Sequence, residues 1–429
     1  MNQEVFNDKI SQGITLMTEG KYEAAKECFE KAIEINVKSI DAYTHLGNAY
    51  ANLQKYNEAI DTLKKVLIID PNYGEAYFSI GSIYVLKEDK VKAVESYNKA
   101  EKYGYKSSQM YQIMASIFFE ADDVAQALRN ITRAISITPF DGELRLFKVR
   151  IYLAYNQYEQ ALDTLDEMEQ ILPDAFEAYD MKAQILMGQQ KHEEALSVIE
   201  KGCERFPEDA NLAVTKLRVL VEADMSLKAY EWLEVMKEKG IYEKAQKNSA
   251  IHEATLLIKD NKIDEAYNVL FKANTKLNND VDILYILLDL CGKTEKYKEL
   301  LIHSEELLSI DCGDFYRATA MFFHATALEE CGNKDDAQKE FKKMTSTMRK
   351  FTINNPSFYE GYLYRLLSHV KIKEYDKALE LADYIHNLYP DKADAHAFRY
   401  YIYKEMGNLV EAEEEKNKAK ELNPNLDIQ

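Results

Sequence analysis

The sequence predicts an all-α protein, and two observations lead to this fold class. Helix-forming residues run from end to end of the 429-residue chain, which contains only 15 glycines and 7 prolines. Residues of the same kind also recur with a period of about 34 residues. A fixed period held over this length is typical of a solenoid, in which each repeat buries its apolar face only against its neighbours. The prolines that carry the period fall into two groups, Pro71, Pro139, Pro173 and Pro207, and then Pro390 and Pro424.

Small residues share this period. A small side chain allows a partner helix to approach closely, so we expect these positions at helix crossings. Seven alanines follow one another at the same interval as the prolines: Ala25, Ala59, Ala93, Ala127, Ala161, Ala195 and Ala229.

Residues 41–71, DAYTHLGNAYANLQKYNEAIDTLKKVLIIDP, show the pattern within one repeat. Apolar residues at helical spacing mark one stripe on a first helix and another on a second helix. The short turn LQKY predicts that the two helices are antiparallel. Pro71 is expected to end the second helix, because proline cannot continue the i→i−4 hydrogen-bond ladder. The residues that carry the pattern are Tyr43, Leu46, Gly47, Tyr50, Ala59, Leu63, Val66 and Pro71.

These residues resemble the signature of the tetratricopeptide repeat (TPR) family, W-x₂-L-G-x₂-Y followed by A-x₃-F, A and P. The resemblance covers nearly the whole chain and implies a right-handed superhelical solenoid of about twelve antiparallel helix pairs. We expect repeats 1–7 in strict 34-residue register over 6–243, and less regular repeats 8–12 over 247–426. The twelve repeats start near residues 6, 40, 74, 108, 142, 176, 210, 247, 281, 318, 359 and 393.

An insertion near 345–361 interrupts the register between repeats 10 and 11. It adds seven residues, about two helical turns, so we expect a longer second helix that stops at Asn354-Asn355-Pro356. Two interpretations stay open. The insertion is either tolerated on an exposed edge, or it changes the local superhelical pitch and shapes a partner site.

Charge and composition restrict the partners and the compartment. The formal net charge of −19 argues against nucleic acids and anionic membranes, because phosphate binding depends on Lys and Arg. No apolar run reaches the roughly 18 residues of a membrane span, and the N-terminal MNQEVFNDKI does not resemble a signal peptide. The five cysteines are odd in number and lack CxxC spacing, which indicates reduced thiols and a cytoplasmic location.

The chain lacks the motifs of common enzymes. His252-Glu253 begins like a zinc-protease helix, but Leu256 stands where HExxH needs histidine. Neither GxGxxG, a P-loop nor GxSxG occurs, and the eight histidines are scattered singly. We therefore expect no enzyme activity, no cofactor and no metal.

The TPR resemblance implies a binding surface instead. In this family the first helices line a concave groove, and their second, fifth, ninth and twelfth positions point into it. The family's clamp for acidic C-terminal tails is absent, because no fifth position here is Lys. Apolar residues at the fifth position also have an alternative role, which is to pack between adjacent first helices. The candidate groove residues are Asn48, Phe78, Ser82, Gln112, Leu146, Arg150, Gln184 and Arg218.

Three functional hypotheses follow. The leading one is a non-catalytic adaptor or scaffold that binds a peptide segment or helix of a partner protein in the concave groove. The second is the regulatory or specificity subunit of an enzyme complex. The third is a self-associating structural protein, in which tyrosine-rich edges meet in a homodimer. All three exclude nucleic-acid binding and membrane insertion.

Overall fold

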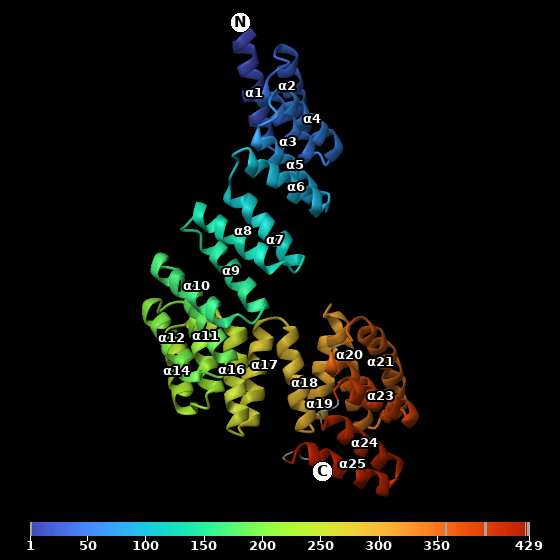
Figure 1. Cartoon of the computed structure of the whole chain (residues 1–429). Helices are drawn as coiled ribbons and strands as arrows, with labels where there is room; N and C mark the ends of the chain where they lie inside the picture. Colours follow the sequence, from blue (N-terminus) through green and yellow to red (C-terminus); the bar gives the residue numbers. More distant parts are fainter. Residues whose placement is uncertain (1, 357, 390–392, 425, 427–429) are drawn as a thin grey trace. The chain divides into compact units, whose positions relative to one another are not determined.

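The computed structural model describes residues 2–356, 358–389, 393–424 and 426. This part of the chain contains 25 α-helices and no strand (Figure 1), which confirms the predicted all-α class. The chain divides into two compact units, Met1–Gly202 and Cys203–Gln429. The boundary lies inside a helix, whereas the sequence places the change of register near residue 243.

Helix pairs of similar length, apart from the longer α1, build the first unit, and each helix from α1 to α10 packs against the next. From α3 onward the first helices begin at the interval that the sequence period predicts. The first helices are α1 (Asn2–Thr18), α3 (Ile40–Asn52), α5 (Gly74–Leu86), α7 (Ser108–Glu120), α9 (Gly142–Ala154) and α11 (Phe176–Gly188). The second helices are α2 (Tyr22–Ile35), α4 (Tyr56–Ile69), α6 (Lys90–Lys102), α8 (Val124–Ile137), α10 (Tyr158–Ile171) and α12 (His192–Arg205).

The second unit contains the irregular repeats. The seventh repeat is followed by an extra short helix, α15 (Ile241–Lys244). The first helices are α13 (Ala210–Glu222), α16 (Gln246–Lys259), α18 (Val281–Lys293), α20 (Gly313–Glu330), α22 (Tyr359–Lys371) and α24 (Asp394–Met406). The second helices are α14 (Ser226–Glu238), α17 (Ile263–Lys276), α19 (Tyr297–Ser309), α21 (Lys334–Asn354), α23 (Tyr375–Leu388) and α25 (Leu409–Leu422).

Two helices of this unit are longer than the rest. Helix α20 begins at Gly313, so the predicted start near 318 is wrong by five residues, and the residues preceding the tenth repeat extend its first helix. Helix α21 has 21 residues, against 14 in a regular second helix such as α4, and ends at Asn354. The seven inserted residues therefore add the two predicted turns and stop before Pro356.

Prolines end the second helices as expected. Helices α4, α8, α10, α12 and α25 each end two residues before a proline, at Pro71, Pro139, Pro173, Pro207 and Pro424. Pro390, which carries the same prediction for α23, lies outside the described residues.

Most of the first helices are followed by a left-handed residue that is not glycine and that the sequence does not reveal. Gln54 has φ 58°, and its neighbours close the turn with hydrogen bonds from Lys55 N to Tyr50 O (2.9 Å) and from Gln54 N to Ala51 O (3.0 Å). This is the Schellman arrangement, which glycine usually completes. Equivalent non-glycine residues with positive φ recur at the same turn of the following repeats: Glu88, Asp122, Asn156, Gln190 and Asp224.

The small periodic residues lie at the helix crossings, as predicted. All seven alanines from Ala25 to Ala229 are fully buried. At Gly47 an added Cβ would lie 2.7 Å from Cγ of Leu63 on the partner helix. Such close approaches hold the two helices of one repeat together, and repeats of this kind are the units of an all-α solenoid.

Candidate functional site

The residues predicted for the concave groove all lie on first helices. Asn48 is on α3, Phe78 and Ser82 on α5, Gln112 on α7, Leu146 and Arg150 on α9, Gln184 on α11, and Arg218 on α13. The side chains of Gln112, Arg150 and Gln184 are exposed, and that of Asn48 is half-buried. Gln184 donates to Oδ2 of Asp180 at 2.8 Å, and Arg150 lies over the ring of Phe147.

Three of the predicted residues serve packing. The Phe78 ring stacks on Tyr105 with centroids 4.8 Å apart, and Ser82 Oγ donates to the Phe78 carbonyl at 3.1 Å. Leu146 is only 7% exposed and belongs to the core. Phe78 and Leu146 therefore fit the alternative role of fifth-position residues, and the expectation that they anchor a peptide at the surface needs this correction.

Arg218 lies in the second unit and is also engaged within the fold. Its Nε lies 3.2 Å from Oε1 of Glu222, one turn further along α13. Burial and the Arg218 charge lower the pKa of His252, on the neighbouring α16, to about 4. Arg218 thus has both a carboxylate partner and a nearby imidazole that stays neutral.

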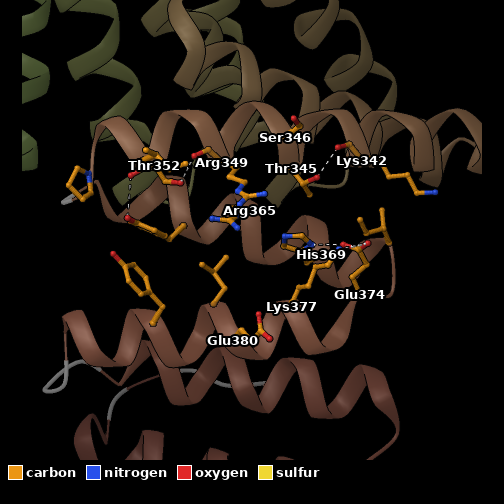
Figure 2. Close-up of a pocket in the computed structure, with 16 residues that line it drawn as sticks. Lys342, Thr345, Ser346, Arg349, Thr352, Arg365, His369, Glu374, Lys377 and Glu380 are labelled. Carbon is orange, nitrogen blue, oxygen red and sulfur yellow. Dashed lines mark hydrogen bonds and ion pairs between the residues drawn. The ribbon is translucent and has the colours of Figure 1, made fainter.

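The second unit contains a groove of about 930 Å³ between α21, α22 and α23. Two second helices form its walls, and the first helix α22 contributes Tyr362, Arg365 and His369 (Figure 2). The two extra turns of α21 supply Arg349, Thr352 and Ile353 to the wall. The inserted residues therefore build part of this groove. From the sequence alone, a role in shaping a site was one of two interpretations of the insertion.

Two arginines occupy the middle of the groove. Figure 2 shows Arg349 of α21 and Arg365 of α22 with their guanidinium groups directed toward one another. Burial and the Arg349 charge lower the pKa of Arg365. Within the described part of the chain neither guanidinium forms an ion pair, so like charges meet here without a carboxylate between them.

One end of the groove is polar and internally neutralised. The buried His369 has its Nδ1 2.8 Å from Oε2 of Glu374, and Lys377 donates to Oε1 of the same carboxylate at 2.9 Å. Burial, helped by the charges of Arg365 and Lys377, lowers the pKa of His369. The hydrogen bond from Lys377 contributes most to lowering the pKa of Glu374, which stays ionised.

The other end of the groove is aromatic and apolar. The Tyr362 and Tyr384 rings lie 5.3 Å apart, and the Tyr362 hydroxyl donates to the Thr352 carbonyl at 3.4 Å. Burial, together with the Tyr384 hydroxyl, raises the pKa of Tyr362 to about 12. Ile353 and Leu381 extend the apolar lining. The groove thus combines a cationic centre with an apolar end, which suits binding better than proton transfer.

Only part of this groove can be predicted from the sequence. The seven-residue insertion was a usable signal, because it placed an arginine in added turns. The sequence carries no signal for the pairing of Arg349 with Arg365, since this pairing depends on how two separate helices pack.

Among the described residues, no group of three His, Cys, Asp or Glu side chains is arranged to hold a metal ion. None of the described helices combines the length and apolar character needed to cross a bilayer.

Comparison with known protein families returns one family several times. Tetratricopeptide repeat models match residues 40–73, residues 118–185, and residues 74–103 with 176–209, and a TPR repeat model matches 13–54. The chain belongs to the tetratricopeptide repeat family. TPR proteins are generally non-catalytic adaptors, and the repeats support a general role in protein–protein interaction.

Solved structures of other TPR proteins resemble the chain at low identity. Yeast Tom70 is 13% identical, with 98% of this chain and 97% of that chain covered and a TM-score of 0.43. Cut9–Hcn1, the hetero-tetramer of APC/C, is 12% identical, with 96% and 93% covered and a TM-score of 0.43. YrrB, described as a TPR protein with an unusual peptide-binding site, is 21% identical, with 44% and 96% covered and a TM-score of 0.36. No curated protein matches the chain.

Proposed function

We propose that this TPR protein is a non-catalytic adaptor that binds a peptide segment or helix of a partner protein along its first helices. The observation that carries the proposal is an exposed polar row on the first unit. Arg150 and Gln184 occupy equivalent positions of consecutive repeats, on α9 and α11, and both are exposed while their neighbours Val149 and Ala183 are fully buried. Gln112 on α7 is exposed as well.

These side chains suit recognition of a partner's backbone. An amide supplies both donors and an acceptor, and a guanidinium supplies five donors, so an extended peptide can be hydrogen-bonded without a deep pocket. The helices that carry them are fixed by fully buried crossings, and a rigid platform lowers the ordering cost of binding. The apolar contribution must come from residues other than Phe78 and Leu146, whose side chains are used within the fold.

The five cysteines are all free, which is compatible with the reducing cytoplasm where we propose that the protein acts. Nucleic acid is not part of the proposal, because the net charge of −19 opposes it.

The test begins with affinity capture and mass spectrometry, followed by titration of the captured partner. The double variant Gln112→Ala with Arg150→Glu should weaken binding at least about tenfold. Arg129→Glu is the matched control, because Arg129 is also exposed but lies on the second helix α8. Equal affinity of the double variant and the wild type, or equal losses in both variants, would contradict the proposal.

The same preparation distinguishes the other two hypotheses. A captured enzyme whose turnover changes on binding would indicate a regulatory subunit. Light scattering after size exclusion would detect a homodimer in the absence of any partner.

A further inference from the structure

The groove between α21, α22 and α23 is a second candidate site, separate from the row of first-helix residues on the first unit. Its lining residues are not those of that row, so the argument for it does not rest on the proposed function above. Three features of the groove decide what it can bind: its unpaired arginines, the balance of its other charges, and its shape.

The first feature is the pair of arginines without acceptors. In the described residues, neither the Arg349 nor the Arg365 guanidinium has a hydrogen-bond or ion-pair partner, and Nε of Arg365 is buried without an acceptor. A buried donor left without a partner is unfavourable, and so is the meeting of two like charges. An oxyanion that lies between the two guanidinium groups would relieve the repulsion between their charges. Arginine also binds carboxylates through two parallel hydrogen bonds, which favours this acceptor.

The second feature is the balance of the other charges. Lys342 and Lys377 add positive charge at the polar end, while Glu374 is already held by His369 and Lys377. Glu380 is the remaining carboxylate that lines the groove. Four cationic side chains therefore face two carboxylates, in a chain whose net charge is −19. The groove is locally cationic on an otherwise acidic protein.

The third feature is the shape. From Lys342 to Ile353 the wall spans eleven helical steps, about 16 Å at roughly 1.5 Å per residue. An extended chain covers that distance in about five residues. The volume of about 930 Å³ is far larger than a single oxyanion needs and lies in the range of sites for sizeable ligands.

We propose that the groove between α21, α22 and α23 binds an extended acidic peptide segment of a partner protein, whose carboxylates lie between Arg349 and Arg365. A hydrophobic residue of the same segment would pack against Tyr362 and Tyr384 at the apolar end. The two inserted turns of α21 then have a role, because Arg349, Thr352 and Ile353 all belong to them.

The proposal can be tested with a fluorescein-labelled hexaglutamate peptide, measured by fluorescence anisotropy on the full chain. Saturable binding is expected, and it should weaken as salt is added. The variant Arg349→Gln with Arg365→Gln should bind at least about tenfold more weakly, because two charge-assisted contacts are lost. Glu380→Gln should bind more tightly than the wild type, because it removes a repulsive charge.

The matched control is Lys31→Gln with Arg129→Gln, which makes the same change in net charge on exposed basic residues of second helices in the first unit. This control should bind hexaglutamate as the wild type does. Hexalysine should not bind the groove. Arg349 is exposed, so Arg349→Gln alone carries the test if the double variant does not fold.

Three outcomes would overturn the proposal. One is an equal loss of affinity in the groove and control variants, which would indicate non-specific electrostatics. Another is unchanged affinity in Arg349→Gln with Arg365→Gln. The third is displacement of the peptide by an equal concentration of inorganic phosphate or a short oligothymidylate, which would assign the groove to small anions or nucleic acid.

Discussion

The ring of Tyr97 fills the space that a side chain on Gly81 would need. A Cβ added to Gly81 would lie 2.7 Å from Cδ1 and Cε1 of this ring, which is fully buried. The Tyr97 hydroxyl is 3.2 Å from Oγ of Ser82, so the ring is held at both ends and cannot withdraw. Gly81 therefore sets how closely α5 and α6 approach.

We predict that Gly81→Ala destabilises the protein, although alanine is the better helix former. Overpacking lowers the free energy of unfolding by about 1–3 kcal/mol, and the higher helix propensity of alanine offsets about 1 kcal/mol of this loss. The control is Gly188→Ala, which adds the same methyl group to helix α11 with nothing within 4 Å. Thermal unfolding should show a lower midpoint for Gly81→Ala and an unchanged or higher one for Gly188→Ala. A rise in both would mean that the crossing is not tight.

Helix α8 allows the same substitution on two faces. Ala127 is fully buried and Ala125, two residues earlier, is exposed. We expect Ala127→Leu to lower the free energy of unfolding by about 1–3 kcal/mol, and Ala125→Leu to change it by less than about 0.5 kcal/mol. Chemical denaturation monitored by helical circular dichroism measures both. Similar losses in the two variants would contradict the assigned crossing.

The left-handed residue at the turn of the third repeat is a site for stabilisation. Glu88 has φ 60°, a conformation that costs a non-glycine residue about 1–2 kcal/mol. Glu88→Gly should therefore raise the free energy of unfolding by about 0.5–1 kcal/mol, after the entropy of the more flexible unfolded chain is subtracted. Glu95→Gly, on an exposed face of α6, should instead lower the free energy of unfolding by about 1 kcal/mol. Opposite signs for these two variants in the same denaturation assay are the expected result.

Stability should fall on mild acidification because of His252. Its pKa is lowered from an ordinary 6.5 to about 4, so between these values the unfolded chain binds more protons than the folded one. The free energy of unfolding should fall by about 1–2 kcal/mol from pH 6.5 to 5, and it should fall less in the His252→Gln variant.

His324 should have the opposite effect on the pH dependence of stability, because its hydrogen bond with Glu340 raises its pKa. Its contribution is complete below pH 6.5 and is lost as pH rises through the raised pKa, so His324→Gln should flatten the alkaline side of the profile.

Much of the fold could be predicted because the repeats are defined by packing residues. The period of Ala59 and Ala93 located the crossings, and Pro71 located a helix end, since both effects act over a few residues. Gln54 and Glu88 could not be recognised as left-handed, because neither is glycine and the conformation is imposed by the turn between two packed helices.

The site was less predictable for a related reason. Phe78 and Leu146 occupy a position that faces either the groove or the neighbouring helix, and only the packing of Tyr105 and the core decides between them. Arg349 and Arg365 lie on separate helices and come together only because the added turns of α21 run alongside α22. No local pattern of residues in the sequence predicts that these two side chains lie close together.

The order of packing along the chain has a consequence for how the protein is made. Within each unit the helices contact mainly those just before and after them. Loops that must close are short, so folding should be fast and should begin at any repeat. During synthesis each helix can dock on its predecessor as soon as it leaves the ribosome, and no early segment waits for a distant partner. A newly made first unit therefore completes its burial of apolar surface while the rest of the chain is still being translated.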